Sequence, residues 1–184
     1  QTVRREFANH PLSKSMSDSN PLKQYARWFK DAIESEIIDP NAACLSTVDE
    51  QGYPSSRIVY IKDIIDDRLI FYTNYNSKKA LDIQQNKHIS VNFFWKELDR
   101  QIRIQGMVEK VSSKVSDAYF ASRPRGSQIG AWASYQSEGL ESREELEERL
   151  FKLQEQFADQ DIPRPPHWGG FGLQPQYFEF WQGR

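Results

Sequence analysis

The stretch R-Q-I-R-I-Q-G at Arg100–Gly106 has the pattern that decides the fold of this chain. Its polar residues Gln101 and Arg103 alternate with the apolar residues Ile102 and Ile104. Successive side chains of a β-strand point to opposite faces, so this alternation predicts a strand with one face in a hydrophobic core. The other face is polar and carries cationic and amide groups that could bind an anion.

The stretch Y-F-A-S-R-P-R-G-S-Q-I-G-A-W-A-S-Y-Q-S at residues 119–137 places Tyr119, Arg123 and Ser127 four residues apart. In a continuous helix these three side chains would stack on one side. Pro124 disfavours such a helix, because it lacks an amide donor and disfavours helical geometry in the residue before it. We expect a helix that ends just before Arg123, a turn, and a new helix from Ser127. A guanidinium between two hydroxyls is typical of a phosphate site.

Composition narrows the class of protein. A chain of 184 residues is long enough for one domain with a real core. The single cysteine, Cys44, favours a reducing compartment. The sequence shows no leader and no long apolar run, so we expect a cytoplasmic protein that does not enter a membrane. A net charge of -2 argues against nucleic acid as a partner, so any phosphate site has to be local.

Periodicity predicts an α+β fold, mainly antiparallel. Residues 1–20 are polar and are expected to form a flexible arm, whereas residues 21–184 show no internal linker and are expected to form a single domain. The proline-rich segment 161–170 is expected to be irregular. The expected helices are 21–37, 77–85, with Ser77 as its cap, and 141–157, and the expected strands are Ala42–Val48, Ser55–Lys62, Arg68–Thr73, His88–Trp95, Arg100–Val111 and Gln176–Trp181. Their spacing is that of an antiparallel meander or small barrel.

Several common chemistries have no signature in the sequence. The histidines, His10, His88 and His167, are scattered without ligand spacing, which argues against a metal site. A Walker loop, a dinucleotide-binding glycine motif and a Ser-His-Asp signature are also missing from the sequence. If the protein is an enzyme, we expect a cofactor to carry the chemistry.

Three clusters could bind such a cofactor. In R-I-V-Y-I-K, Arg57 and Lys62 lie at the two ends of an apolar run, on opposite faces of a regular strand. In F-Y-T-N-Y-N-S-K-K, Lys78 and Lys79 lie at a helix start, where amide donors and ammonium groups favour a phosphate, although a solvated lysine pair explains this motif equally well. Gln101 and the pair Gln136 and Ser137 could bind the polar edge of a ring.

The order of these motifs resembles one family. R-I-V-Y-I-K, F-Y-T-N-Y-N-S-K-K, F-F-W-K-E-L-D-R-Q-I-R-I-Q-G, the 119–137 stretch, P-x-P-P-x-W-G-G-F and E-F-W-Q-G follow one another as they do in the pyridoxine (pyridoxamine) 5′-phosphate oxidases. The resemblance implies an FMN-binding split β-barrel with surrounding helices and a homodimer with FMN at the subunit interface. It also implies oxidation of pyridoxine or pyridoxamine 5′-phosphate to pyridoxal 5′-phosphate, with oxygen as acceptor and hydrogen peroxide as product.

The resemblance also assigns residues to the two ligands. The segment 4–7, R-R-E-F, would be a mobile lid over the site. Matched by motif, the FMN contacts would be Arg57, Ile58, Val59, Tyr60, Ile61, Lys62, Tyr72, Thr73, Lys78, Lys79, Gln101, Gln136, Ser137 and Trp181, and the substrate contacts would be Arg4, Arg5, Glu6, Phe7, Lys62, Tyr119, Arg123 and Ser127.

The sequence departs from the family pattern at three places. Phe7 stands where Tyr is usual, and Lys78 stands where Arg is frequent, which keeps the charge but loses the planar fork of donors. The family pattern continues past W-Q-G with R-L-H-D-R, and turnover is expected to be weak in a protein without that segment. The alternatives are a related split-barrel flavin oxidase or reductase, such as the phenazine-biosynthesis type, and a non-catalytic binder of FMN or pyridoxal phosphate.

Overall fold

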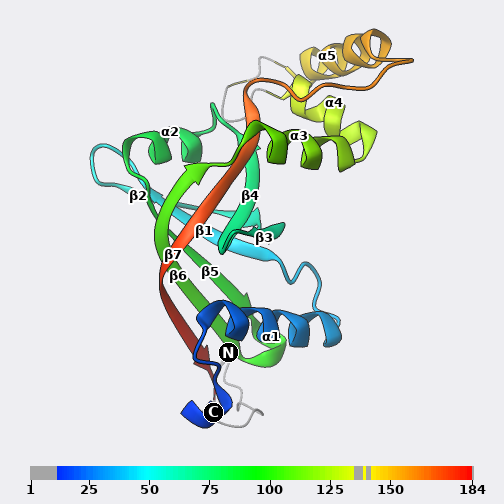
Figure 1. The fold of residues 1–184 in the computed structure, drawn as a ribbon. Coiled ribbons are helices and arrows are strands. Elements are labelled where there is room, and N and C mark those ends of the chain that lie inside the picture. The colour runs from blue at the N-terminus through cyan, green and yellow to red at the C-terminus, as the bar shows by residue number, and fades with distance from the viewer. Residues whose placement is uncertain (1–11, 135–138, 140–141, 184) are drawn as a thin grey trace, which may run out of the picture.

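A seven-stranded sheet forms the centre of the computed structural model, which describes residues 12–134, 139 and 142–183. Every neighbouring pair of strands is antiparallel, in the order β2-β1-β5-β6-β7-β4-β3, and the sheet curls into a half-barrel (Figure 1). The strands are β1 (Ala42–Val48), β2 (Pro54–Tyr60), β3 (Asp63–Ile65), β4 (Arg68–Asn74), β5 (His88–Trp95), β6 (Arg100–Lys110) and β7 (Trp168–Gln182).

Helices cover the two ends of this half-barrel. Helix α1 crosses one end, whereas α3, α4 and α5 gather at the other (Figure 1). Asn20 caps α1, because its side chain accepts hydrogen bonds from the amides of Leu22 and Lys23. The helices are α1 (Pro21–Glu34), α2 (Lys78–Gln85), α3 (Ser113–Ser122), α4 (Arg125–Ala133) and α5 (Arg143–Gln156), with short 3₁₀ turns at Lys14–Met16 and Lys96–Leu98. Within the described ranges, no helix combines the length and apolarity that a membrane crossing requires.

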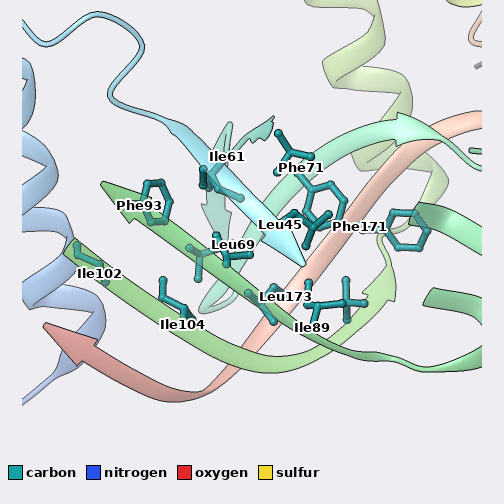
Figure 2. Close-up of a cluster of buried hydrophobic side chains, with 14 of the residues drawn as sticks. Leu45, Ile61, Leu69, Phe71, Ile89, Phe93, Ile102, Ile104, Phe171 and Leu173 are labelled. Atoms are coloured by element: carbon teal, nitrogen blue, oxygen red, sulfur yellow. The ribbon is translucent and has the colours of Figure 1, made fainter. Parts of the chain in front are cut away.

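The concave face of the sheet holds the main hydrophobic core. Ile102 and Ile104 are both 0% exposed, which confirms the core face predicted for the Arg100–Gly106 stretch. They lie beside Leu45, Phe93 and other apolar residues of β1, β4, β5 and β7 (Figure 2). Burial of such side chains is the main favourable term in folding, at about 1.5–3 kcal/mol for each large aliphatic or aromatic residue.

The last strand is much longer than predicted. Segment 161–170 was expected to be irregular and the strand to begin at Gln176, but β7 begins at Trp168. Glycines allow this strand to pass close to its neighbours: a Cβ on Gly170 would lie 2.7 Å from Val111 and 2.8 Å from the ring of Tyr72. The glycines that indicated a loop are therefore small residues at a crowded sheet position.

Three smaller differences concern turns and helix starts. The short strand β3 was not predicted. Helix α4 begins at Arg125 instead of Ser127, because Pro124 can occupy the position before a helix without losing a hydrogen bond. Ser77 does lie at the start of α2, but its hydroxyl donates to the carbonyl of Asn74 and makes no cap to the helix.

Candidate functional site

A cavity of about 480 Å³ brings together residues from both predicted ligand sets. It lies where β2 and β4 end beside the junction of α3 and α4. Its wall contains predicted cofactor contacts from β2, β4 and α2 and predicted substrate contacts from α3 and α4. The lining residues are Ile58, Val59, Tyr60, Lys62, Tyr72, Thr73, Lys79, Tyr119, Arg123, Pro124, Ser127 and Trp168.

One end of the cavity is cationic and rich in hydroxyls. The Nζ of Lys79 donates to the hydroxyls of Thr73 and Ser77, each at 3.2 Å. Lys79 is only 8% exposed. Its burial, together with the positive charge of Arg57, lowers its pKa to about 8. A buried cation beside hydroxyls at the start of α2 fits a phosphate group.

Arg57 lies behind this cationic end and is held there by several acceptors. Its Nη1 donates to the hydroxyl of Thr47 at 2.7 Å, and its Nη2 donates to the hydroxyl of Ser55 at 2.7 Å. The carboxylate of Asp82 lies 3.8 Å from Nη2. Arg57 does not line the cavity itself, and it acts on the cavity through its charge beside Lys79.

Lys78 has a different position from its neighbour in the sequence. Its side chain is half-exposed, does not line the cavity, and forms ion pairs with Asp82 at 2.6 Å and Asp49 at 3.4 Å. The structure therefore separates the predicted lysine pair into one buried residue in the cavity and one residue at the surface. The hydrogen bond to Asp82, the largest cause, raises the pKa of Lys78, whereas burial lowers the pKa of Lys79.

The other end of the cavity contains Tyr119, Arg123 and Ser127, which the sequence places four residues apart. Helix α3 ends at Ser122, Arg123 adopts an extended backbone, and α4 begins after Pro124, as the proline predicted. The three side chains line one cavity in spite of this break. Among the described residues, the buried Nη1 of Arg123 has no hydrogen-bond partner. A buried donor without a partner is costly, and an anionic ligand would satisfy it.

Aromatic rings line the cavity beside these cations. The rings of Tyr72 and Tyr119 are stacked, with centroids 3.8 Å apart and planes 6° apart. Trp168 lies nearly parallel to both, with centroids at 5.5 Å from Tyr72 and 6.3 Å from Tyr119. Burial raises the pKa of Tyr72 to about 12, so its phenol is neutral at physiological pH. Such a wall suits flat heterocycles.

Sequence reasoning did not assign Trp168 to the site. Its motif was recognised, but it lies in a segment that was expected to be irregular, and its contacts come from β4 and α3. The signal that could have indicated it is the tryptophan between a proline run and two glycines. Pro124 also lines the cavity without having been assigned to it.

Several predicted residues are not brought to this cavity by the single chain. Gln101 and Trp181 face each other across β6 and β7, at the end of the sheet near α1. Ile61 is 4% exposed and belongs to the hydrophobic core. The predicted contacts Arg4, Arg5, Glu6, Phe7, Gln136 and Ser137 lie outside the described residues.

Acidic and metal-binding groups contribute little to this site. Within the part of the chain that the structure describes, no group of three or more His, Cys, Asp or Glu side chains could hold a metal ion. The polar side chains that line the cavity are cations and hydroxyls, and the other lining residues are aromatic or aliphatic. Cations and hydroxyls suit phosphate groups, and aromatic rings suit flat heterocycles.

Comparisons with known proteins agree with this chemistry. Proteins named pyridoxine/pyridoxamine 5′-phosphate oxidase from Cyanothece sp. and Paraburkholderia phymatum are 47% and 50% identical to this chain over 182 residues, which are 99% of this chain and 85% of each relative. The solved structure of PhzG from Burkholderia lata in complex with tetrahydrophenazine-1-carboxylic acid has a TM-score of 0.89 at 28% identity, over 97% of this chain and 88% of PhzG.

A more distant structure shares the fold. A pyridoxamine 5′-phosphate oxidase-related, FMN binding protein from Nostoc punctiforme has a TM-score of 0.69 at 17% identity, over 88% of this chain and 83% of that protein. The antiparallel half-barrel with its surrounding helices is thus a split-barrel fold, as the sequence predicted. The family model described as pyridoxamine 5′-phosphate oxidase matches residues 29–157, and the chain belongs to this family.

Proposed function

We propose that this protein is an FMN-dependent oxidase that converts pyridoxine 5′-phosphate and pyridoxamine 5′-phosphate to pyridoxal 5′-phosphate, with oxygen as acceptor and hydrogen peroxide as product. One observation carries the proposal: a single cavity is lined by cations from separate elements, Lys79 of α2 and Arg123 between α3 and α4, together with aromatic rings. Two separate phosphate-binding ends fit two phosphorylated ring compounds that must lie against each other.

The residues of the cavity would divide the binding between the two ligands. Lys79, Thr73 and the charge of Arg57 would hold the FMN phosphate, whereas Arg123 would bind the substrate phosphate bidentately, with Tyr119 and Ser127 as further donors. Bound FMN would supply the redox chemistry, namely hydride acceptance and reoxidation by oxygen. The protein then contributes position and electrostatics, and Lys62 at the cavity wall would serve both ligands.

We further propose a homodimer with FMN at the subunit interface. Gln101 and Trp181 belong to the predicted FMN contacts, yet they lie at the end of the sheet near α1 in their own chain. The convex face of the same sheet exposes large apolar side chains, with Phe94 60%, Ile58 63% and Trp181 42% exposed. Exposed apolar groups on one face are typical of an interface. A second copy on this face would supply Gln101 and Trp181 to its partner's cavity.

An aerobic assay tests the proposal. The purified protein, loaded with FMN and dialysed, is mixed with pyridoxine 5′-phosphate, and the aldehyde product and hydrogen peroxide are followed. We expect both products in equal amounts. A protein that retains FMN but forms no aldehyde would support the non-catalytic binder, and a protein that stays colourless after dialysis would contradict the cofactor assignment.

The similarity to PhzG supports a second candidate, an oxidase of phenazine-type ring compounds. Tetrahydrophenazine-1-carboxylic acid, the ligand in that structure, has a carboxylate and no phosphate. Arg123, with its buried and unpartnered Nη1 flanked by two hydroxyl residues of the cavity, fits the larger phosphate better. Turnover of a tricyclic carboxylate in preference to pyridoxine 5′-phosphate would favour the second candidate.

A further inference from the structure

We propose that Trp168 is a positioning residue for the substrate phosphate, because its ring supports the guanidinium of Arg123 and leaves the N–H donors of that group available to the ligand. This inference rests on the proposed function, since it assumes that Arg123 binds the phosphate of a pyridine ring compound. It adds to the site a residue whose role is to hold another residue in place.

The contact between the two residues is direct. The central carbon of the Arg123 guanidinium lies 4.6 Å from the ring centre of Trp168 and 5.6 Å from that of Phe120. Trp168 is 7% exposed and Phe120 is 1% exposed, so the cation rests on a dry aromatic surface. A cation on an aromatic face is stabilised by the ring quadrupole, most strongly on tryptophan and when the pair is desolvated.

An aromatic support has a consequence that an acidic partner would not have. A carboxylate beside Arg123 would occupy its N–H groups and neutralise its charge, so a phosphate would have to displace it. The guanidinium lies over the ring of Trp168, and an aromatic ring does not occupy its N–H donors as a carboxylate would. The buried Nη1 of Arg123, which lacks a hydrogen-bond partner among the described residues, agrees with this arrangement. The cation is held in place while its charge and its donors stay directed at the ligand.

Arg164 fixes the position of Trp168. Its Nη1 donates to the carbonyl of Trp168 at 2.6 Å, and its Nε donates to the carboxylate of Asp117 in α3 at 2.6 Å. The Arg164 side chain is only 15% exposed, which favours a well-defined geometry. Arg164 thus connects the start of β7 to α3, the helix that carries Tyr119. This connection holds Trp168 and Tyr119 in a fixed position relative to each other.

Binding of two ligands that differ only in the phosphate provides the test. FMN-loaded protein is titrated with pyridoxal 5′-phosphate and with pyridoxal, and the two dissociation constants are compared for the wild type and for Trp168→Leu. We expect Trp168→Leu to weaken binding of pyridoxal 5′-phosphate about tenfold more than it weakens binding of pyridoxal. Trp168→Phe should retain most of the affinity, because phenylalanine still presents an aromatic face.

A double-mutant cycle separates positioning from general packing. In an Arg123→Leu background, Trp168→Leu should no longer change the ratio of the two dissociation constants, because the supported group is gone. Trp28→Leu is the matched control: Trp28 lies 4.5 Å under Arg100 at the opposite end of the sheet, and its loss should not change the ratio of the two dissociation constants. Equal weakening of both ligands by Trp168→Leu, or an undiminished effect in the Arg123→Leu background, would overturn the proposal.

Two further variants apply if Trp168→Leu does not fold. Arg164→Gln should weaken binding of pyridoxal 5′-phosphate a few-fold more than binding of pyridoxal, and Trp168→Phe should do so by a smaller factor. An unchanged ratio of the two dissociation constants in Arg164→Gln would also overturn the proposal. Failure of the proposed function is distinguishable from these results. It would appear as an FMN-loaded wild type that forms no aldehyde, whereas the ratio of the two dissociation constants does not depend on turnover.

Discussion

The Nζ of Lys78 lies 2.6 Å from one carboxylate oxygen of Asp82, and the other oxygen accepts a hydrogen bond from Thr47 at 2.7 Å. Asp82 is 3% exposed and also lies 3.8 Å from Arg57. One buried carboxylate therefore connects β1, β2 and α2 behind the proposed FMN phosphate position. Burial opposes ionisation of Asp82, but the hydrogen bonds from Lys78 and Thr47 outweigh it, and the pKa lies below its ordinary value.

Replacing this carboxylate should reduce stability. In Asp82→Ala the buried hydroxyl of Thr47 loses its acceptor and Arg57 loses its nearby anion, and we expect the free energy of unfolding to fall by about 2 kcal/mol. Asp82→Asn should lose less, because its amide oxygen can still accept from Thr47. Urea unfolding at neutral pH measures both. Equal stability of Asp82→Ala and the wild type would show that the network contributes nothing.

The same carboxylate predicts a pH dependence of stability. A pKa lower in the folded state than its ordinary value of 3.8 means that the contribution is complete above pH 3.8 and is lost as the pH falls through the folded value. The wild type should thus lose stability more steeply with acid than Asp82→Asn does. Parallel acid profiles of the two proteins would contradict the assignment.

Lys79 predicts a pH dependence of cofactor binding. Its pKa of about 8 means that the ammonium is charged below that pH and neutral above it. A bound phosphate favours the charged form of Lys79, so FMN affinity should be constant between about pH 7, where the phosphate is a dianion, and pH 8, and should decline as the pH rises beyond 8. Quenching of flavin fluorescence measures the affinity. Riboflavin, which has no phosphate, is the control and should show no such decline, and neither should FMN with Lys79→Gln.

Dimerisation should depend on the convex face of the sheet. Phe94 on β5 is 60% exposed, and we expect Phe94→Asp to convert a dimer to a monomer with a strongly reduced FMN affinity, because Gln101 and Trp181 of a second copy would be lost. Analytical ultracentrifugation gives the mass. Phe151→Asp on α5 is the matched control, since Phe151 is 59% exposed and lies outside the sheet. A monomeric wild type that still binds FMN tightly would contradict the interface.

Local patterns in the sequence predicted much of this fold, because they depend on neighbours in the chain. The alternation around Ile102 and Ile104 predicted strand β6, and Pro124 predicted the break between α3 and α4. Contacts between distant segments were not predictable in this way. Thr47 and Asp82 are 35 residues apart, and nothing near either of them indicates the pair. The different positions of Lys78, at the surface, and Lys79, in the cavity, also depend on distant partners such as Asp49, which pairs with Lys78.

The start of β7 was missed for a related reason. Glycine disfavours regular structure when only the local chain is considered, but Gly169 and Gly170 are required by side chains from other strands. The hydroxyl of Tyr75 and the ring of Tyr72 occupy the space where a Cβ would lie. The cavity also depends on these contacts between distant segments, because Trp168, the first residue of β7, lines it.

Gly170→Ala should therefore damage the site through the fold. Its Cβ would lie 2.8 Å from the ring of Tyr72 and 2.7 Å from Val111, so Tyr72 has to move from its stack with Tyr119. We expect a loss of about 1–3 kcal/mol in the free energy of unfolding and weaker FMN binding. Gly130→Ala is the control, because a Cβ there has no atom within 4 Å and alanine favours the helix. That variant should be at least as stable as the wild type.

Arg123→Leu separates the two phosphate sites. The substitution removes a bidentate donor at one end of the cavity and leaves Lys79, Thr73 and Arg57 unchanged at the other, so the KM for pyridoxine 5′-phosphate should rise about a hundredfold while FMN stays bound. The visible absorbance of the dialysed variant gives the flavin content, and initial rates of aldehyde formation give KM. Loss of flavin with an unchanged KM in the reconstituted variant would mean that Arg123 binds the phosphate of the cofactor. The assignments of the two phosphates to Arg123 and Lys79 would then have to be reversed.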